Sequence, residues 1–426
     1  MDGRYPLGHY WRPLVHYSFA LDHAIWGLTP FGYHLTDVLI LCANAVLLTL
    51  LASRFFVSRW CVIAGVYFAF HDVHVDVLQA PARRADALAL MFTLLALVTT
   101  LSFEKRPAIR RIATAMCCVL ALMSKETGAV AVVAVVLVHF IVGREHGVVA
   151  RTTRALREAW PALAGFALTF AGRAAVLGGL GGARESSLSS ALLEAPDTLA
   201  RYAPTLLAPP LLRSFGAWSV SLSIVVGAAL ALACVAALRR VRARSARELA
   251  QPFASVLLFC VAWFVVLALT TALSGAERGW YELPFTAPAT LLYFALFALA
   301  FEAAGRRSFV VALFVTPLVL AGVQFRTRAI PMELAEASDA ERRFLDAFEN
   351  AVRGAQRGEV VRVAGFVPEI ACSAPALEGR ARSVTMLAPY SVQAYADLVF
   401  GVGRVALVDP RHSVVPPGAV GVVLTR

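Results

Sequence analysis

The stretch LTDVLILCANAVLLTLLASR (35–54) decides the fold class of this 426-residue chain. It is almost entirely apolar over about 20 residues, the length that an α-helix needs to cross a bilayer. Comparable runs recur along the chain, which is 59% hydrophobic and only 16% charged. A soluble domain is usually about 25% charged and does not need long uncharged runs. We therefore predict an all-α polytopic integral membrane protein.

Apolar runs on both sides of this stretch predict about ten transmembrane helices. They lie near residues 35–54, 60–72, 86–103, 109–124, 127–143, 159–177, 218–238, 253–273, 285–303 and 308–323. The remaining C-terminal part is polar, with helical patterns at 333–354 and 391–400 and strand patterns at 360–364, 405–408 and 420–424. The predicted domains are a transmembrane domain, 1–324, and a small soluble α/β module, 325–426.

The basic residues predict the orientation of these helices. The net charge of +11 comes almost entirely from arginine. Alternate loops, beginning after residue 54, are rich in arginine, whereas the opposite loops are poor in it. The positive-inside rule places the rich loops in the cytoplasm and both termini outside. The charge is thus explained by topology and lipid headgroups, without a nucleic-acid partner.

Charged residues in the outside loops are the candidates for chemistry, because charges near hydrocarbon are costly and usually functional. The richest loop contains His71, His74 and Asp76, followed by Arg84 and Asp86. These groups could bind a divalent cation, position a phosphate or move a proton. The alternative is a solvated loop whose histidines lie at the level of the lipid headgroups.

Three further outside segments carry candidates. Lys125 and Glu126 lie in a very short turn, where a mutual ion pair is the alternative to a functional role. Arg278 and Tyr281 lie in another turn, and Arg12 lies in an aromatic N-terminal segment; both segments could simply be interfacial anchors. Converging cations suit an anionic lipid phosphate, and a nearby acid suits a general base.

Four segments together resemble the GT-C membrane glycosyltransferases. The resemblance is strongest to the transmembrane, tetratricopeptide-repeat-bearing O-mannosyltransferase-like proteins and their bacterial relatives. The segments are YWRPLVHYSFALDHAIWGLTPFGYHLTDVL (10–39), FHDVHVDVLQAPARRADAL (70–88), SKETG (124–128) and ERGWYELP (277–284). They occur in the family's order and cover roughly residues 9–325.

The resemblance implies transfer of mannose or another hexose from a polyprenyl-phosphate donor to a hydroxyl of a protein, lipid or glycan acceptor. The chemistry would occur on the non-cytoplasmic face of a membrane, and a bacterial inner membrane is expected. Residue by residue, it implies these roles: Asp76, His74 and Glu126 as catalytic groups; Arg84, Lys125 and Arg278 as donor-phosphate ligands; His71, Asp86, Arg12 and Tyr281 as supporting groups. A divalent metal, if present, would bind His71, His74 and Asp76.

The chain also departs from the family's pattern. Family members begin with a transmembrane helix and an acidic loop, so we expect one further helix before Met1. Asp72 and Arg83 replace the usual proline and glycine, and the C-terminal module stands where repeats would follow. The alternatives are therefore a truncated or degenerate, non-catalytic paralogue and, less favoured, a transporter or lipid flippase. Repeated halves with broken helices, typical of transporters, are not found in the sequence.

Overall fold

The computed structural model describes most of the first 177 residues and selected parts of the remainder. The described residues are 11–55, 58–71, 73–78, 81–103, 105–143, 145, 147–177, 193, 196–197, 243–274, 283–304, 345–346, 348–350, 352–353, 361–363, 369–371, 383–385, 400 and 405–407. The chain divides into two compact units, one of residues 8–323 and one of residues 1–7 with 324–426. Each unit is described by itself below.

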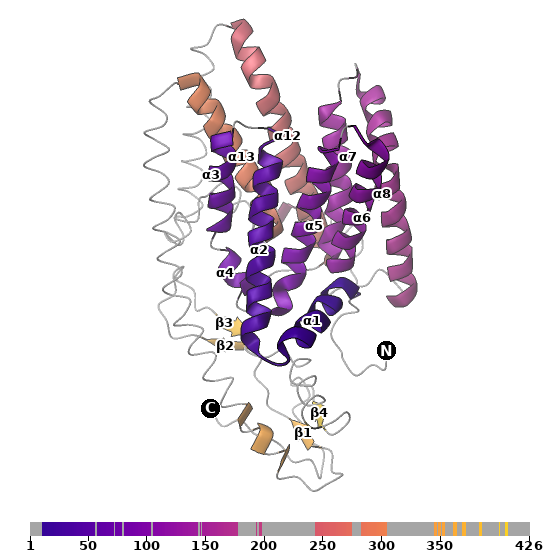
Figure 1. Ribbon diagram of the computed structural model, residues 1–426, viewed down its shortest axis with the longest axis vertical. Helices are drawn as coiled ribbons and strands as arrows, with labels where there is room; N and C mark the ends of the chain where they lie inside the picture. The colour runs from indigo at the N-terminus through magenta and orange to yellow at the C-terminus, as the bar shows by residue number, and fades with distance from the viewer. Residues whose placement is uncertain are drawn as a thin grey trace. The chain divides into compact units, whose positions relative to one another are not determined.

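The first unit is a bundle of helices (Figure 1). Its longer helices are α1 (Pro13–Trp26), α2 (Pro30–Ala52), α3 (Ser58–Ala69), α5 (Arg84–Thr100), α6 (Pro107–Ser124), α7 (Val130–Val142), α8 (Val148–Leu177), α12 (Ala243–Ser274) and α13 (Leu283–Ala304). Shorter turns are α4 (Val73–Leu78) and the 3₁₀ helices η1 (Pro81–Arg83) and η2 (Glu126–Ala129).

Local sequence explains where the first helices begin and end. Proline occupies the first position of α1, α2 and α6, where its missing N–H is not needed and its fixed φ suits a helix. Gly27 ends α1 with a φ of 59°, a conformation that side chains disfavour, and its N–H donates to the carbonyl of His23. The chain can therefore turn from α1 directly into α2.

Helix α5 lies at the centre of the unit. It packs against α2, α6, α7 and α13, and most of its side chains are buried. A helix that is apolar on every side is typical of a protein interior. Around it, α6 packs on α8, α7 packs on α8 and α12, and α12 packs on α13.

Four described helices are long and apolar enough to span a membrane: α2, α6, α8 and residues 255–272 of α12. Three shorter apolar helices lie at 60–69, 126–142 and 283–295. Helices also occupy the predicted spans 86–103 and 159–177, while the predicted spans 218–238 and 308–323 lie outside the described residues. A membrane protein built of transmembrane helices is thus supported, and the total of ten spans stays a prediction.

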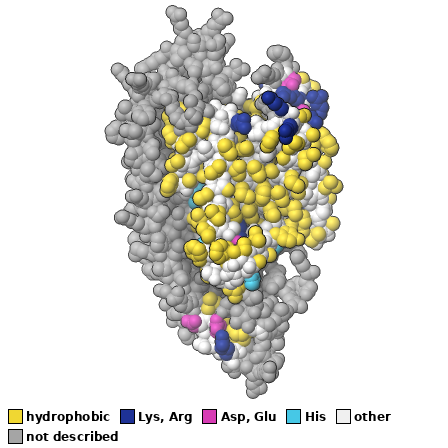
Figure 2. All heavy atoms as spheres, in the orientation of Figure 1, with side chains coloured by type: hydrophobic (Ala, Val, Ile, Leu, Met, Phe, Trp, Pro, Cys, Tyr) yellow, Lys and Arg dark blue, Asp and Glu magenta, His cyan; other side chains and the backbone are white. Residues whose placement is uncertain are grey.

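The surface of the bundle fits this assignment. Figure 2 shows hydrophobic side chains over the middle of the visible face, with Lys and Arg gathered at one end. Large apolar side chains such as Leu168, Ile112 and Met116 are 75%, 65% and 62% exposed. Contiguous apolar surface of this kind is typical of a face that contacts lipid or a partner.

The second unit contains short strands among its described residues. β1 (Val361–Val363) pairs in parallel with β4 (Val405–Leu407), and β2 (Glu369–Ala371) pairs antiparallel with β3 (Ser383–Thr385). β1 and β4 lie within two predicted strand ranges; the predicted strand 420–424 lies outside the described residues. Because most of this unit is also outside them, the α/β module and the boundary between 324 and 325 stay predictions.

Candidate functional site

Three of the four sequence motifs meet at one end of the bundle, the lower end in Figure 1, where α1, α4 and the first turn of α5 lie. The helices of three motifs contact each other there: α1 packs on α2, α5 and α6, and η2 packs on α5. We call this end the motif end. Charged side chains pair across it in two separate networks, one around Arg84 and one around Lys125 and Glu126.

Arg84 begins α5 and is completely buried. Its Nε donates to Asp37 Oδ1 at 2.5 Å, and its Nη1 lies 2.6 Å from Asp22 Oδ2. Its Nη2 donates to the carbonyl of Tyr33 at 2.9 Å, and its Cζ lies 4.5 Å from the centre of the Phe19 ring. All of these partners lie on α1 or α2, so one guanidinium ties both helices to α5.

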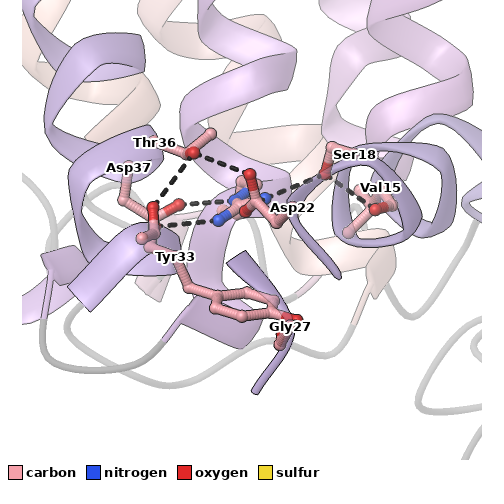
Figure 3. A network of polar contacts seen from close by, with 9 residues as sticks. Val15, Ser18, Asp22, Gly27, Tyr33, Thr36 and Asp37 are labelled. Carbon is pink, nitrogen blue, oxygen red and sulfur yellow. Dashed lines mark hydrogen bonds and ion pairs between the residues drawn. The ribbon is translucent and has the colours of Figure 1, made fainter. Parts of the chain in front are cut away.

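Hydroxyl groups complete this cluster (Figure 3). Thr36 donates to Asp22 Oδ1 at 2.7 Å, and Ser18 Oγ lies 3.3 Å from an Arg84 nitrogen while donating to the carbonyl of Val15 at 2.7 Å. Asp22 and Asp37 are 2% and 1% exposed. Buried charges of this kind are costly unless they are paired, and both carboxylates are paired with Arg84. The predicted contact between Arg84 and a donor phosphate has no support in this geometry, since the guanidinium faces two carboxylates.

Lys125 and Glu126 do not pair with each other. Lys125 Nζ donates to Asp86 Oδ1 at 2.5 Å, and both side chains are buried. Burial lowers the pKa of Lys125, because removing an ammonium from water disfavours its charged form. This pair ties the end of α6 to the first turn of α5.

Glu126 lies between two arginines. Arg12 Nη2 donates to Glu126 Oε2 at 2.7 Å, and Arg173 Nη1 donates to Oε1 at 2.9 Å. Arg173 is buried, whereas the side chains of Arg12 and Glu126 are 21% and 18% exposed. Burial alone would raise the pKa of Glu126, but the attraction of Arg12, followed by that of Arg173, lowers it to about 2. The carboxylate is therefore ionised at neutral pH and is a weak base.

The glycine in the SKETG motif has a steric role. A Cβ on Gly128 would lie 2.0 Å from the carbonyl oxygen of Ala121 in α6, a distance that no side chain allows. The absence of a side chain lets η2 pack directly against the α6 backbone. This close approach places Glu126 within reach of α1 and α8.

His71 and His74 lie near α4 with their ring centroids 6.5 Å apart. One nitrogen of each ring faces the backbone: Val73 N–H donates to His71 Nδ1 at 3.3 Å, and His74 Nε2 lies 2.6 Å from the carbonyl oxygen of Phe68. In the part of the chain that the structure describes, no three His, Cys, Asp or Glu side chains are placed to hold a metal. The metal site with Asp76 stays a prediction, because the Asp76 side chain is not among those described.

Arg278 and Tyr281 lie outside the described residues. Of the other predicted residues, the structure brings Arg12, Asp86, Lys125 and Glu126 to the motif end. Arg84 lies at the same end in its own cluster, and His71 and His74 are buried just before α4 and within it.

Two residues of these networks were not predicted from the sequence. Asp37 lies within the first predicted span and Arg173 within the sixth, and both are buried and paired. A charge inside an otherwise apolar span was the available signal, because such residues face a protein interior and have a partner. Asp22, which lies in the first motif segment (10–39), is likewise buried against Arg84.

Comparison with known proteins gave relatives by sequence alone. No family model matches the chain, and no solved structure matches it. The chain is 36% identical over 143 residues to "Protein O-mannosyl-transferase Tmtc1" of Drosophila melanogaster, a match covering 32% of this chain and 16% of that protein. It is 35% identical over 125 residues to TMTC2 of Mus musculus, covering 28% and 15%, and 39% identical over 89 residues to TMTC2 of Homo sapiens, covering 21% and 11%.

These matches span less than a fifth of each of the three relatives. Identity across the matched relatives ranges from 28% to 39%. The four sequence motifs indicate the same group of proteins. The resemblance is thereby confirmed: over part of its length, the chain is homologous to the TMTC protein O-mannosyltransferases.

Proposed function

We propose that this protein is a membrane glycosyltransferase acting at its motif end. It would move mannose or another hexose from a polyprenyl-phosphate donor to a hydroxyl acceptor on the non-cytoplasmic face. The observation that carries the proposal is the meeting of three motifs, distant in sequence, through the Arg12–Glu126 and Lys125–Asp86 contacts. The names of the relatives support transfer of mannose to protein, so a Ser or Thr hydroxyl is the favoured acceptor.

The proposed reaction is an inverting displacement. A base removes the proton of the acceptor hydroxyl, whose oxygen forms a bond to the anomeric carbon. The bond from that carbon to the phosphate oxygen breaks, and its electron pair leaves with the polyprenyl phosphate. Cationic groups accelerate this step by stabilising the charge that develops on the leaving phosphate.

Arg12 is the described cation best placed for that role. It stands at the N-terminus of α1, its side chain is partly exposed, and Glu126 fixes its direction. Lys125 is buried against Asp86, so it would act on the leaving phosphate through its charge and not by direct contact. Arg278 remains a proposed third cation. Arg84 is better assigned to holding α1, and with it Arg12, on the bundle.

The base must be a different group from Glu126. A carboxylate with a pKa of about 2 has little affinity for a proton at neutral pH, and efficient bases have a pKa near the working pH. Of the proposed catalytic residues, Asp76 and His74 remain as bases. The described candidate metal ligands at this site are two imidazoles, His71 and His74, and Asp76 remains the proposed third.

The test is transfer by the full-length protein in proteoliposomes that contain radiolabelled dolichyl-phosphate mannose and a Ser/Thr-rich peptide. Arg12→Ala should lower kcat by about 100-fold, as expected for losing one group that stabilises a transition state. Asp76→Asn should abolish transfer, whereas Glu126→Gln should retain measurable transfer. Arg54→Ala, at the opposite end where Arg54 contacts Ser102, is the matched control and should be unaffected.

Unchanged transfer by Arg12→Ala would overturn the role of Arg12. No transfer by the folded wild-type protein with any polyprenyl-phosphate hexose would overturn the enzyme proposal and favour the degenerate paralogue.

A further inference from the structure

A group of arginines lies at the end of the bundle opposite the motif end. Figure 2 shows Lys and Arg side chains gathered there above the hydrophobic surface. We call this group the basic patch and define it by five arginines on α6 and α8 and two nearby glutamates: Arg110, Arg111, Arg151, Arg154, Arg157, Glu145 and Glu158.

The structure draws the arginines of two helices together. Glu158 on α8 accepts hydrogen bonds from Arg110 at 2.6 Å and from Arg111 at 2.8 Å, both on α6. At the start of α8, Glu145 pairs with Arg154 at 2.9 Å, and its carbonyl accepts from Arg151 at 2.8 Å. The carboxylate of Glu158 is thus shared by two arginines, whereas that of Glu145 pairs with Arg154 and its backbone carbonyl contacts Arg151.

The charges of the patch do not balance. Five guanidinium groups against two carboxylates leave a net positive charge among the described residues, and Arg157 lies exposed beside them. The side chains of Arg111 and Arg154 are each 34% exposed. Like charges brought this close repel, so an anion from outside would stabilise the arrangement.

The surface below the patch is apolar. Ile112 on α6 is 65% exposed, and Trp160 and Leu168 on α8 are 58% and 75% exposed. Trp160 follows the patch directly in sequence, and tryptophan is enriched where the hydrocarbon meets the headgroups. The same two helices therefore present cationic side chains next to exposed apolar side chains. This arrangement matches the anionic headgroup and the acyl chains of a phospholipid.

We infer that the basic patch binds the headgroup of an anionic phospholipid, with its acyl chains lying along α6 and α8. Clusters of arginine just beyond a transmembrane helix attract anionic lipids electrostatically. Guanidinium groups suit this task because they hold phosphate oxygens with two parallel hydrogen bonds. The patch is distant from the motif end, so this inference does not rest on the proposed transferase activity.

The experiment measures lipid retention by the purified full-length protein in detergent, using native mass spectrometry. Palmitoyl-oleoyl phosphatidylglycerol is titrated against palmitoyl-oleoyl phosphatidylcholine. The wild type should retain the anionic lipid at least about tenfold more strongly, because each arginine of the patch that faces the headgroup contributes about fivefold. Arg154→Gln combined with Arg157→Gln should reduce that preference by about tenfold or more; Arg110 and Arg111 are left intact because they tie α6 to α8.

Arg54→Gln removes one arginine from the same end of the bundle and is the matched control, expected to bind within about twofold of the wild type. Equal retention of the two lipids, or an equal loss in Arg54→Gln, would overturn the inference. So would displacement of the lipid by millimolar inorganic phosphate, which would indicate a site for free phosphate. If the double variant does not fold, 0.5 M NaCl must weaken anionic-lipid binding to the wild type, and unchanged binding would refute the electrostatic basis.

Discussion

Replacing Arg84 with methionine tests whether the buried cluster at the start of α5 holds the motif end together. Methionine keeps much of the length of the side chain but removes its charge and all of its donors. The change leaves Asp22 and Asp37 buried without their shared cation, and it also removes the donor to the Tyr33 carbonyl.

The magnitude follows from the burial of the partners. Arg84 is 0% exposed and its two acids are 1–2% exposed, so water cannot replace the lost contacts. Removing one partner of a buried ion pair typically costs about 3–5 kcal/mol, because the remaining charge is uncompensated. We expect Arg84→Met to lower the free energy of unfolding by that amount. Adding Asp22→Asn and Asp37→Asn should restore much of it, since no buried charge then remains.

The assay is unfolding of the purified protein in mixed detergent micelles with increasing sodium dodecyl sulfate, followed by circular dichroism. Lys105→Met is the control: this lysine is exposed, and its change should shift the free energy by less than about 0.5 kcal/mol. The reasoning is refuted if Arg84→Met unfolds like the wild type, or if the triple variant is no more stable than Arg84→Met.

Three further predictions concern the rest of the structure. Asp86→Leu alone should destabilise the protein by about 3 kcal/mol because it removes the buried carboxylate that contacts Lys125, and Lys125→Met added to it should recover most of the loss in the same assay. Because the pKa of Glu126 is about 2 rather than 4.5, its stabilising charge is fully present above pH 4.5 and lost as the pH falls toward 2. The difference in melting temperature between wild type and Glu126→Gln should therefore shrink over that window, and a constant difference would contradict it. A membrane-impermeant maleimide should label Thr29→Cys and Lys105→Cys from opposite sides of sealed vesicles. Labelling of both cysteines from the same side would exclude the predicted orientation of the helices.

The positions of two helices could be predicted from sequence to within a few residues, whereas α8 and α12 begin at Val148 and Ala243, well before the predicted spans 159–177 and 253–273. The predicted span 86–103 corresponds to α5, Arg84–Thr100, and the predicted span 109–124 to α6, Pro107–Ser124. An unbroken apolar run specifies a helix because backbone groups must be satisfied internally in lipid. This constraint acts within one segment, so a helix can be predicted without knowledge of the helices that pack against it.

The partners of the charged residues could not be predicted in the same way. Adjacent Lys125 and Glu126 suggested a mutual pair, but Lys125 has an extended backbone with φ −160° and ψ 156°. Successive side chains of an extended backbone point in opposite directions. Lys125 therefore faces α5, and Glu126 faces α1 and α8. Which partner each side chain contacts therefore depends on the φ and ψ of Lys125 at the end of α6. The periodicity of apolar residues carries no information about these two angles.

The ion pairs also restrict which group can act as the base of the proposed reaction. Among the described residues of the motif end, Asp22 and Asp37 face Arg84, and Asp86 faces Lys125. Glu126 is held between two arginines, and that environment lowers its pKa. Each of these four carboxylates thus lies against at least one cationic side chain. A carboxylate that takes a proton from an acceptor must have fewer cationic neighbours, so the argument for Asp76 comes from its position in the motif and from the engagement of the other four.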